Sequence, residues 1–140
     1  MNAPLKVKIP NITKELAMNG RCSYFLEGDT IHMEIDAIAN NRIASSLSGG
    51  LSLELWALPA PYQGGYFSGQ PVAGCRLGVL RGQHELRNWQ HQQLAQPVSE
   101  GLWYLTLMLR ERDNGGYVTR DYMNFPDAVK VEYKMVMNFA

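Results

Sequence analysis

The sequence predicts an all-β domain over residues 1–140, an antiparallel two-sheet β-sandwich with an immunoglobulin-like architecture. Several short runs alternate between apolar and polar residues, as a strand with one buried face does. Turn residues separate these runs, and no long stretch repeats with the period of a helix. The chain is 46% hydrophobic and only 19% charged, which indicates a folded core, and no linker or internal repeat divides it.

The first strands form a hairpin. Residues 21–27 are aromatic and strand-like, and the Gly-Asp pair at 28–29 is typical of a tight turn. In the following run, 30–37, every odd position is apolar and every even position is polar. We expect a strand there, with Ile31 and Ile35 toward the core and its polar side chains in water.

The middle of the chain contains two strands and an irregular loop. Residues 51–58 alternate again, and the strand ends at Pro59 because proline has no N–H to donate. Gly and Pro exclude a regular element between Pro59 and Pro71, but three aromatic residues there predict an ordered loop. Another strand is expected over 72–80.

The strongest strand signal lies over residues 102–111, where Trp and Leu alternate with residues that favour strands. Asp-Asn-Gly-Gly at 113–116 predicts a tight hairpin into a strand over 117–125. A last alternating run predicts a strand over 129–137. The Gln-rich segment 82–96 has no clear period, which leaves a short strand and one helical turn as alternatives.

The same alternation predicts which side chains form the core. Three runs supply most of this inward set, which comprises Ile31, Ile35, Leu53, Leu55, Cys75, Leu77, Trp103, Leu105, Leu107, Val131 and Tyr133. The opposite face of the two strands over 51–58 and 102–111 is also largely apolar, so we expect a cover over it. The loops over 59–71 and 82–96 are the favoured cover, and a homodimer is the alternative to a monomer.

Charge and composition argue against two classes of partner. The 13 basic and 13 acidic residues balance to zero net charge, and the basic ones are scattered, so we expect neither nucleic acid nor a membrane as a partner. No apolar run approaches the ~20 residues of a membrane span. The first ten residues have no apolar stretch behind their charges, which predicts a cytoplasmic protein.

Cysteine and histidine form no recognisable metal or catalytic motif. Cys22 and Cys75 lie in different strand-like runs, and we expect free thiols, with an inter-sheet disulfide as the alternative. His32 shares a strand face with Glu34 and Asp36, but steps of about 7 Å are too wide for one metal without a neighbouring strand. A solvated polar face is the expected role of this row.

No other segment carries a catalytic or cofactor motif. His84 and His91 have neither protease nor zinc-finger spacing, no GxSxG elbow occurs, and the Gly-rich pieces match no phosphate-binding loop. We therefore expect no cofactor and no metal. Calcium is a weak exception, because oxygen ligands cluster in sequence near one hairpin, at Asp113, Asn114, Asp121 and Asp127. Turn chemistry is the simpler interpretation of the Asp-Asn-Gly-Gly tip.

Aromatic residues are more suggestive of function. Tyr62, Tyr66 and Phe67 lie in the Pro- and Gly-framed loop, where no strand pattern requires them to be core. Exposed aromatic side chains can stack on a sugar ring or anchor a protein partner. Packing of the three side chains back onto the sandwich is the competing interpretation.

Spaced motifs between residues 51 and 125 provide a resemblance to a known module. They are Leu53–Ala57, Pro61-Tyr62 with Gly64-Gly65, Leu77-Gly78, Gly101–Leu105 and Tyr117–Phe125. The segment resembles a bacterial β-rich module associated with extracellular, calcium-binding-repeat and peptidase-associated proteins. The resemblance implies a secreted setting, in contrast to the cytoplasmic expectation, and it supplies no catalytic or ligand residue.

These observations favour a non-catalytic binding or interaction module. Its ligand-binding residues would be Tyr62, Tyr66 and Phe67, and its partner a protein or a carbohydrate. A carbohydrate-binding domain that uses the loop over 59–71 is one alternative. A small hydrolase whose site is assembled from separated residues is another.

Overall fold

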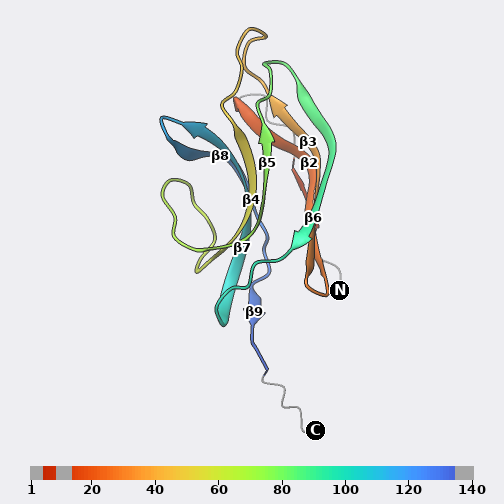
Figure 1. Ribbon diagram of the computed structural model, residues 1–140, viewed down its shortest axis with the longest axis vertical. Coiled ribbons are helices and arrows are strands. Elements are labelled where there is room, and N and C mark those ends of the chain that lie inside the picture. The colour runs from red at the N-terminus through yellow and green to blue at the C-terminus, as the bar shows by residue number, and fades with distance from the viewer. Residues whose placement is uncertain (1–4, 9–13, 135–140) are drawn as a thin grey trace.

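The computed structural model describes residues 5–8 and 14–134, and it has the predicted class of fold. Two antiparallel sheets pack face to face, and no helix occurs within these two ranges (Figure 1). Accordingly, nothing in the described parts of the chain qualifies as a membrane-spanning helix.

One sheet has four strands in the spatial order β1-β2-β3-β6, with the bounds Leu5–Lys8, Leu16–Glu27, Thr30–Asn40 and Glu85–Leu94. β2 and β3 form the predicted hairpin, and Gly28 in its turn has a φ of 61°. Between Asn19 and Cys22 the register of β2 shifts, and Gly20 has a φ of 77° there. The freed Arg21 N–H donates to a carboxylate oxygen of Asp36 at 2.8 Å, so the bulge remains hydrogen-bonded.

The other sheet has five strands. Its main path is β5-β4-β7-β8, with the bounds Gln70–Gly78, Leu51–Leu58, Gly101–Asp113 and Gly116–Asn124. β9, Val129–Val131, pairs with the first residues of β7. β7 is the centre of this sheet, because Leu107 lies opposite Leu55 of β4 on one side and Met123 of β8 on the other.

The core lies between the two sheets, as the alternation predicts. Six residues of the expected inward set are at most 7% exposed, namely Ile31, Ile35, Leu53, Leu55, Leu105 and Leu107. Phe125 follows β8 and packs edge-on against Tyr24 of β2, with ring centroids 4.7 Å apart. Aromatic burial therefore joins the sheets at the end where β8 finishes.

Five expected core residues are less buried than the alternation predicts. The prediction that Tyr133 is buried is wrong, since 56% of this residue is exposed. Four others are half-buried at the rim, namely Cys75, Leu77, Trp103 and Val131. The predicted strand over 129–137 is also too long, because β9 ends at Val131, and residues 135–137 lie outside the described residues. Tyr133 comes after the paired residues, and its hydroxyl donates to the Val98 carbonyl at the surface.

The segment 82–96 is a strand and not a cover over the second sheet. It contains the ten-residue β6, which pairs antiparallel with β3 and places Trp89 opposite Ile35. β6 is an edge strand with most of its side chains exposed, so polar residues occupy positions that a central strand would fill with apolar ones. The absence of a clear period in the sequence follows from this position.

Two carboxylates point into the sandwich from the β7–β8 hairpin. Glu111 continues the inward face of β7, and a bulge at Arg120 in β8 turns Asp121 inward opposite Leu109. Glu111 accepts hydrogen bonds from Arg42, which follows β3, at 2.7 and 2.8 Å. Asp121 accepts one from the Met18 N–H of β2 at 2.8 Å. Each carboxylate therefore connects the two sheets.

The core model predicts a large loss of stability in Leu107→Ala. Leu107 is 1% exposed, and truncating such a residue costs about 2 to 5 kcal/mol through lost burial and the remaining cavity. The free energy of unfolding in urea measures this loss. Leu102→Ala is the matched control on the same strand, because Leu102 is 57% exposed and its truncation should cost less than about 0.5 kcal/mol. Equal losses in the two variants would contradict the assignment of the core.

Candidate functional site

The loop between β4 and β5 folds over the outer face of the five-stranded sheet (Figure 1). Under it lies a second apolar cluster, separate from the main core, in which Leu58 is 3%, Tyr62 6% and Met108 0% exposed. Trp56, Phe67 and Tyr122 pack against this cluster. The prediction that a loop covers the apolar outer face is thus confirmed for 59–71 around Leu58 and Met108, whereas Leu102 on the same face is 57% exposed.

Tyr62 fixes the loop to the sheet. Its backbone N–H donates to the side-chain oxygen of Asn124 at 3.1 Å, and its carbonyl accepts from the Asn124 amide at 2.8 Å. Its hydroxyl donates to the Gly65 carbonyl at 2.6 Å, which closes the turn where Gly64 and Gly65 have φ values of 96° and 77°. L-residues with side chains rarely adopt such angles, so these two glycines suit the turn.

The three predicted binding residues have different environments. Tyr62 is a packing residue, because its ring is buried between Tyr122 and Phe67 at centroid distances of 4.7 and 5.7 Å. Phe67 is half-buried and meets Trp56 edge-on at 4.9 Å. Tyr66 is 96% exposed. Tyr62 therefore packs back onto the sandwich, which was the competing interpretation, whereas Tyr66 faces solvent.

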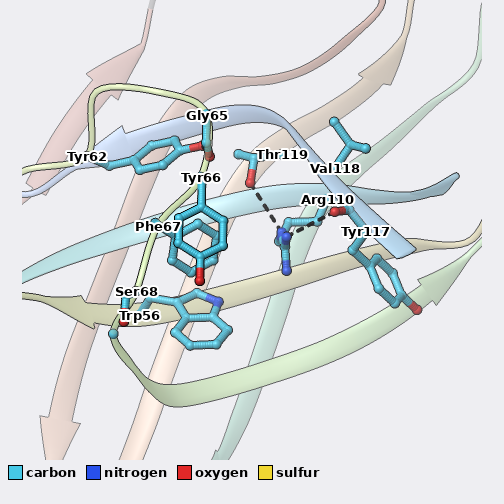
Figure 2. A pocket seen from close by; sticks show the side chains of 11 residues that line it. Trp56, Tyr62, Gly65, Tyr66, Phe67, Ser68, Arg110, Tyr117, Val118 and Thr119 are labelled. Atoms are coloured by element: carbon cyan, nitrogen blue, oxygen red, sulfur yellow. Dashed lines mark hydrogen bonds between the residues drawn. The ribbon is translucent and has the colours of Figure 1, made fainter. Parts of the chain in front are cut away.

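Figure 2 shows the hollow that these residues surround. Its volume is about 650 Å³, and it lies between the loop and strands β4, β7 and β8. The side chains that shape it are Trp56, Tyr66, Phe67, Arg110, Tyr117 and Thr119. Both aromatic faces and hydrogen-bonding groups are therefore available to a ligand.

Arg110 is held in place at the floor of the hollow. Its guanidinium donates to Glu54 at 3.2 Å, to the Thr119 hydroxyl at 3.2 Å and to the Tyr117 carbonyl at 3.1 Å. It also lies 5.0 Å from the ring centroid of Phe67. The Trp56 indole N–H donates to the same Glu54 oxygen at 2.9 Å. These contacts give the site a fixed shape and pair its cation with an anion.

Sequence reasoning missed Arg110, Tyr117 and Thr119 as site residues. The available signal was the alternation of the strands, which places Trp56 and Arg110 opposite the inward Leu residues. That pattern does not predict which loop covers the outer face or where the cover stops. The sequence also did not predict that β8 contributes to the site, because Thr119 lies opposite Arg110 only after the bulge at Arg120 shifts the register.

The histidines lie away from this hollow. The His32 ring stacks on Phe25 at 4.2 Å between centroids and lies 3.6 Å from a Glu27 oxygen. His91 is hydrogen-bonded to Gln93 at 2.9 Å on β6, which belongs to the same four-stranded sheet as His32. His84 is exposed just before β6. None of the three lines the hollow beside Tyr66.

The calcium candidates are dispersed and neutralised. Asp121 is buried and accepts hydrogen bonds from Lys14 at 2.8 Å and from Lys8. Asp113 pairs with Arg120 at 3.3 Å, and Asn114 forms the hairpin turn with a φ of 50°. In residues 5–8 and 14–134, no three His, Cys, Asp or Glu side chains are placed to hold one metal ion.

The buried charges have shifted pKa values. The hydrogen bond from Arg42 lowers the pKa of Glu111 from 4.5 to about 2; burial opposes this shift, and the Gly49 N–H and Arg120 reinforce it. Burial by itself raises the pKa of Asp121, but hydrogen bonds from Lys14, Lys8 and the Met18 N–H outweigh it. The pKa of Asp121 is therefore below its usual value. Both carboxylates are charged at neutral pH.

Cys22 and Cys75 are both free thiols, on strands of opposite sheets. Burial raises the pKa of the Cys22 thiol to about 11, with a smaller opposing effect of Lys8. Burial also raises the pKa of Cys75. Neither sulfur is activated as a nucleophile, because the reactive form is the thiolate.

Comparisons with known proteins add no functional assignment. No family model matches this chain, and neither a curated protein nor a solved structure matches it significantly. The resemblance to the bacterial β-rich module consequently remains a prediction from the sequence motifs.

The buried carboxylates predict a loss of stability in acid. Their pKa values are lower in the folded than in the unfolded chain, so the stability that they contribute is lost in acid. For Glu111 this stability is present above about pH 4.5 and disappears as the pH falls toward about 2. Urea unfolding at a series of pH values measures this slope.

Glu111→Gln provides the test of that assignment. Removing one partner of a buried pair costs about 3 to 5 kcal/mol at neutral pH, and the variant should lose less stability between pH 5 and pH 2 than the unmodified chain. Glu34→Gln, at an exposed position of β3, is the matched control and should keep the original pH slope. An unchanged slope in Glu111→Gln would show that this carboxylate is not responsible.

Proposed function

We propose that this protein is a non-catalytic binding module whose recognition site is the aromatic hollow beside Tyr66. The exposure of Tyr66 carries the proposal, since 96% of this large aromatic residue faces solvent, whereas the other two aromatic residues of the loop are buried (Tyr62) and half-buried (Phe67). Burial of Tyr62 and its hydrogen bonds to Asn124 hold the loop before any ligand arrives. Binding to such a preorganised surface requires little ordering of the chain.

The chemistry of the hollow supports binding more than catalysis. Arg110 and Glu54 bond to each other, and the histidines lie elsewhere. A hydrolase would need a nucleophile with a base in hydrogen-bonding reach. The two-layer, immunoglobulin-like architecture suits a binding role, because rigid sheets can present one variable loop to a partner.

Carbohydrate is the ligand class that the lining favours over a protein partner. Trp56 and Tyr66 offer aromatic surface for the faces of sugar rings, and Arg110 and Thr119 offer groups for hydroxyls. A protein partner is the alternative, in which Tyr66 would act as the anchor of an interface.

Nuclear magnetic resonance tests the location of the site. Amide and indole N–H resonances would be followed while pooled oligosaccharides, and then pooled proline-rich peptides, are added to the protein. We expect the first shifts at the Trp56 indole and at residues 65–68, because these groups border the hollow.

Tyr66→Ala should remove those shifts and lower affinity by at least about 1 kcal/mol, with a melting temperature within experimental error of the original. Tyr133→Ala is the matched control, since Tyr133 is also an exposed tyrosine but lies elsewhere. Shifts centred away from the hollow, or equal effects of the two variants, would contradict the proposal.

A further inference from the structure

The hollow beside Tyr66 adjoins a second hollow at the β5 edge of the same sheet. The second one has a volume of about 410 Å³ and is lined by residues of β4 and β5 and by Gln93 and Gln96. Trp56 and Arg110 border both hollows. The two hollows therefore meet at these shared side chains, and together they are called the trough.

The register of the strands gives the direction of this trough. Arg76 of β5 lies opposite Ser52 of β4, Ser52 lies opposite Arg110 of β7, and Arg110 lies opposite Thr119 of β8. This row crosses four neighbouring strands, a distance of roughly 14 Å at about 4.8 Å per strand. The trough accordingly runs across the strands and is longer than a single sugar or amino-acid side chain.

Small residues keep the β5 half of the trough open. Gly74 of β5 lies opposite Glu54 of β4. Glu54 is the outward residue between Ser52 and Trp56 on β4, so Gly74 lies beside the row from Arg76 to Thr119. A Cβ atom at Gly74 would have no neighbour closer than 3.7 Å, and the backbone there is not in the left-handed region. The fold therefore does not require glycine at this position, and the missing side chain leaves space on the surface.

The groups that face the trough suit hydroxyl ligands. Glu54 and Arg110 lie side by side at 3.2 Å, so an acceptor and a donor are presented together as an ion pair, and Arg76 adds a second cation at the β5 end. A sugar hydroxyl both donates and accepts, and two neighbouring hydroxyls can engage the carboxylate and the guanidinium at once. Trp56 and Tyr66 add aromatic surface along one wall.

An extended peptide fits this surface less well. Strand addition needs unpaired backbone groups at the edge of a sheet, whereas β4 and β7 are paired on both sides beneath the trough. Recognition here depends on side chains alone. A proline-rich peptide uses aromatic grooves of this kind, so it is the competing ligand in the experiment below.

We infer that the trough binds a linear oligosaccharide laid across β8, β7, β4 and β5, with one sugar stacked at Tyr66 and the next units over Glu54, Arg110 and Gly74. This inference rests on the proposed function, because both use the hollow beside Tyr66. It adds the linear form and length of the carbohydrate, its direction across the sheet and a second set of contacts at β5.

Titration calorimetry with sugars of increasing length tests the trough. The probes are glucose, cellobiose and the cello-oligosaccharides up to cellohexaose, with xylo- and chito-oligosaccharides of the same lengths and a proline-rich peptide. In the series that binds, affinity should rise at least about tenfold from the disaccharide to the length that spans β5 to β8, and then level off. Longer oligosaccharides should bind no more tightly, because their additional sugar units lie beyond the trough.

Two variants separate the halves of the trough. Gly74→Leu fills the β5 half and should weaken the longest sugars at least about fivefold while leaving the disaccharide unchanged. Tyr66→Ala should weaken sugars of every length. Arg87→Ala, at an exposed position of the other sheet, is the control and should change neither the affinity for the longest sugars nor that for the disaccharide. The melting temperature of each variant verifies that it is folded.

The outcomes distinguish this inference from the proposed function. Affinity that does not depend on length, or a loss of disaccharide binding in Gly74→Leu equal to that of the longest sugars, would overturn the trough but leave the hollow at Tyr66 as a binding site. Binding of only the proline-rich peptide, abolished by Tyr66→Ala, would overturn the carbohydrate class alone. If no probe binds at Tyr66, both proposals fail.

Discussion

Charge pairing between the two sheets is the constraint on which the rest of this structure depends. Glu111 and Asp121 point inward from the β7–β8 hairpin, and each needs partners from the opposite sheet or its connections. A buried carboxylate without partners would be strongly unfavourable, so these pairs restrict how the sheets can lie relative to each other. The bulge at Arg120 turns Asp121 inward, and Arg120 pairs with Glu111 at 2.9 Å. It also brings Thr119 opposite Arg110 on the outer face, where the candidate site forms.

The loop over 59–71 depends on a smaller core of its own. Met108 and Tyr122 are outward residues of β7 and β8, and Tyr62 covers them, so apolar surface that would face water is buried instead. Asn124 satisfies both backbone groups of Tyr62, which removes the usual cost of burying a loop. The main core therefore positions the sheet, and this second cluster positions Tyr66 above it.

The trough exists because that cover is incomplete. The loop occupies the half of the outer face around Leu58 and Met108, while the row from Arg76 to Thr119 stays open beyond it. Arg110 lies at this boundary and is bonded to Glu54, Thr119 and the Tyr117 carbonyl. A cation fixed in this way stays at the surface and is compatible with an uncharged ligand.

The sequence by itself determined most of the strands, the β2–β3 and β7–β8 hairpins and the inward faces of β3, β4 and β7, because alternation and turn chemistry are local properties. It also determined that the outer face of β4 and β7 needs a cover. Only the tertiary structure decided that β6 joins β3, that Tyr62 is core while Tyr66 is exposed, and that Asp121 is buried with Lys14 rather than exposed at a hairpin. These features depend on which distant segments meet, and alternation says which side of a strand is buried without saying what buries it.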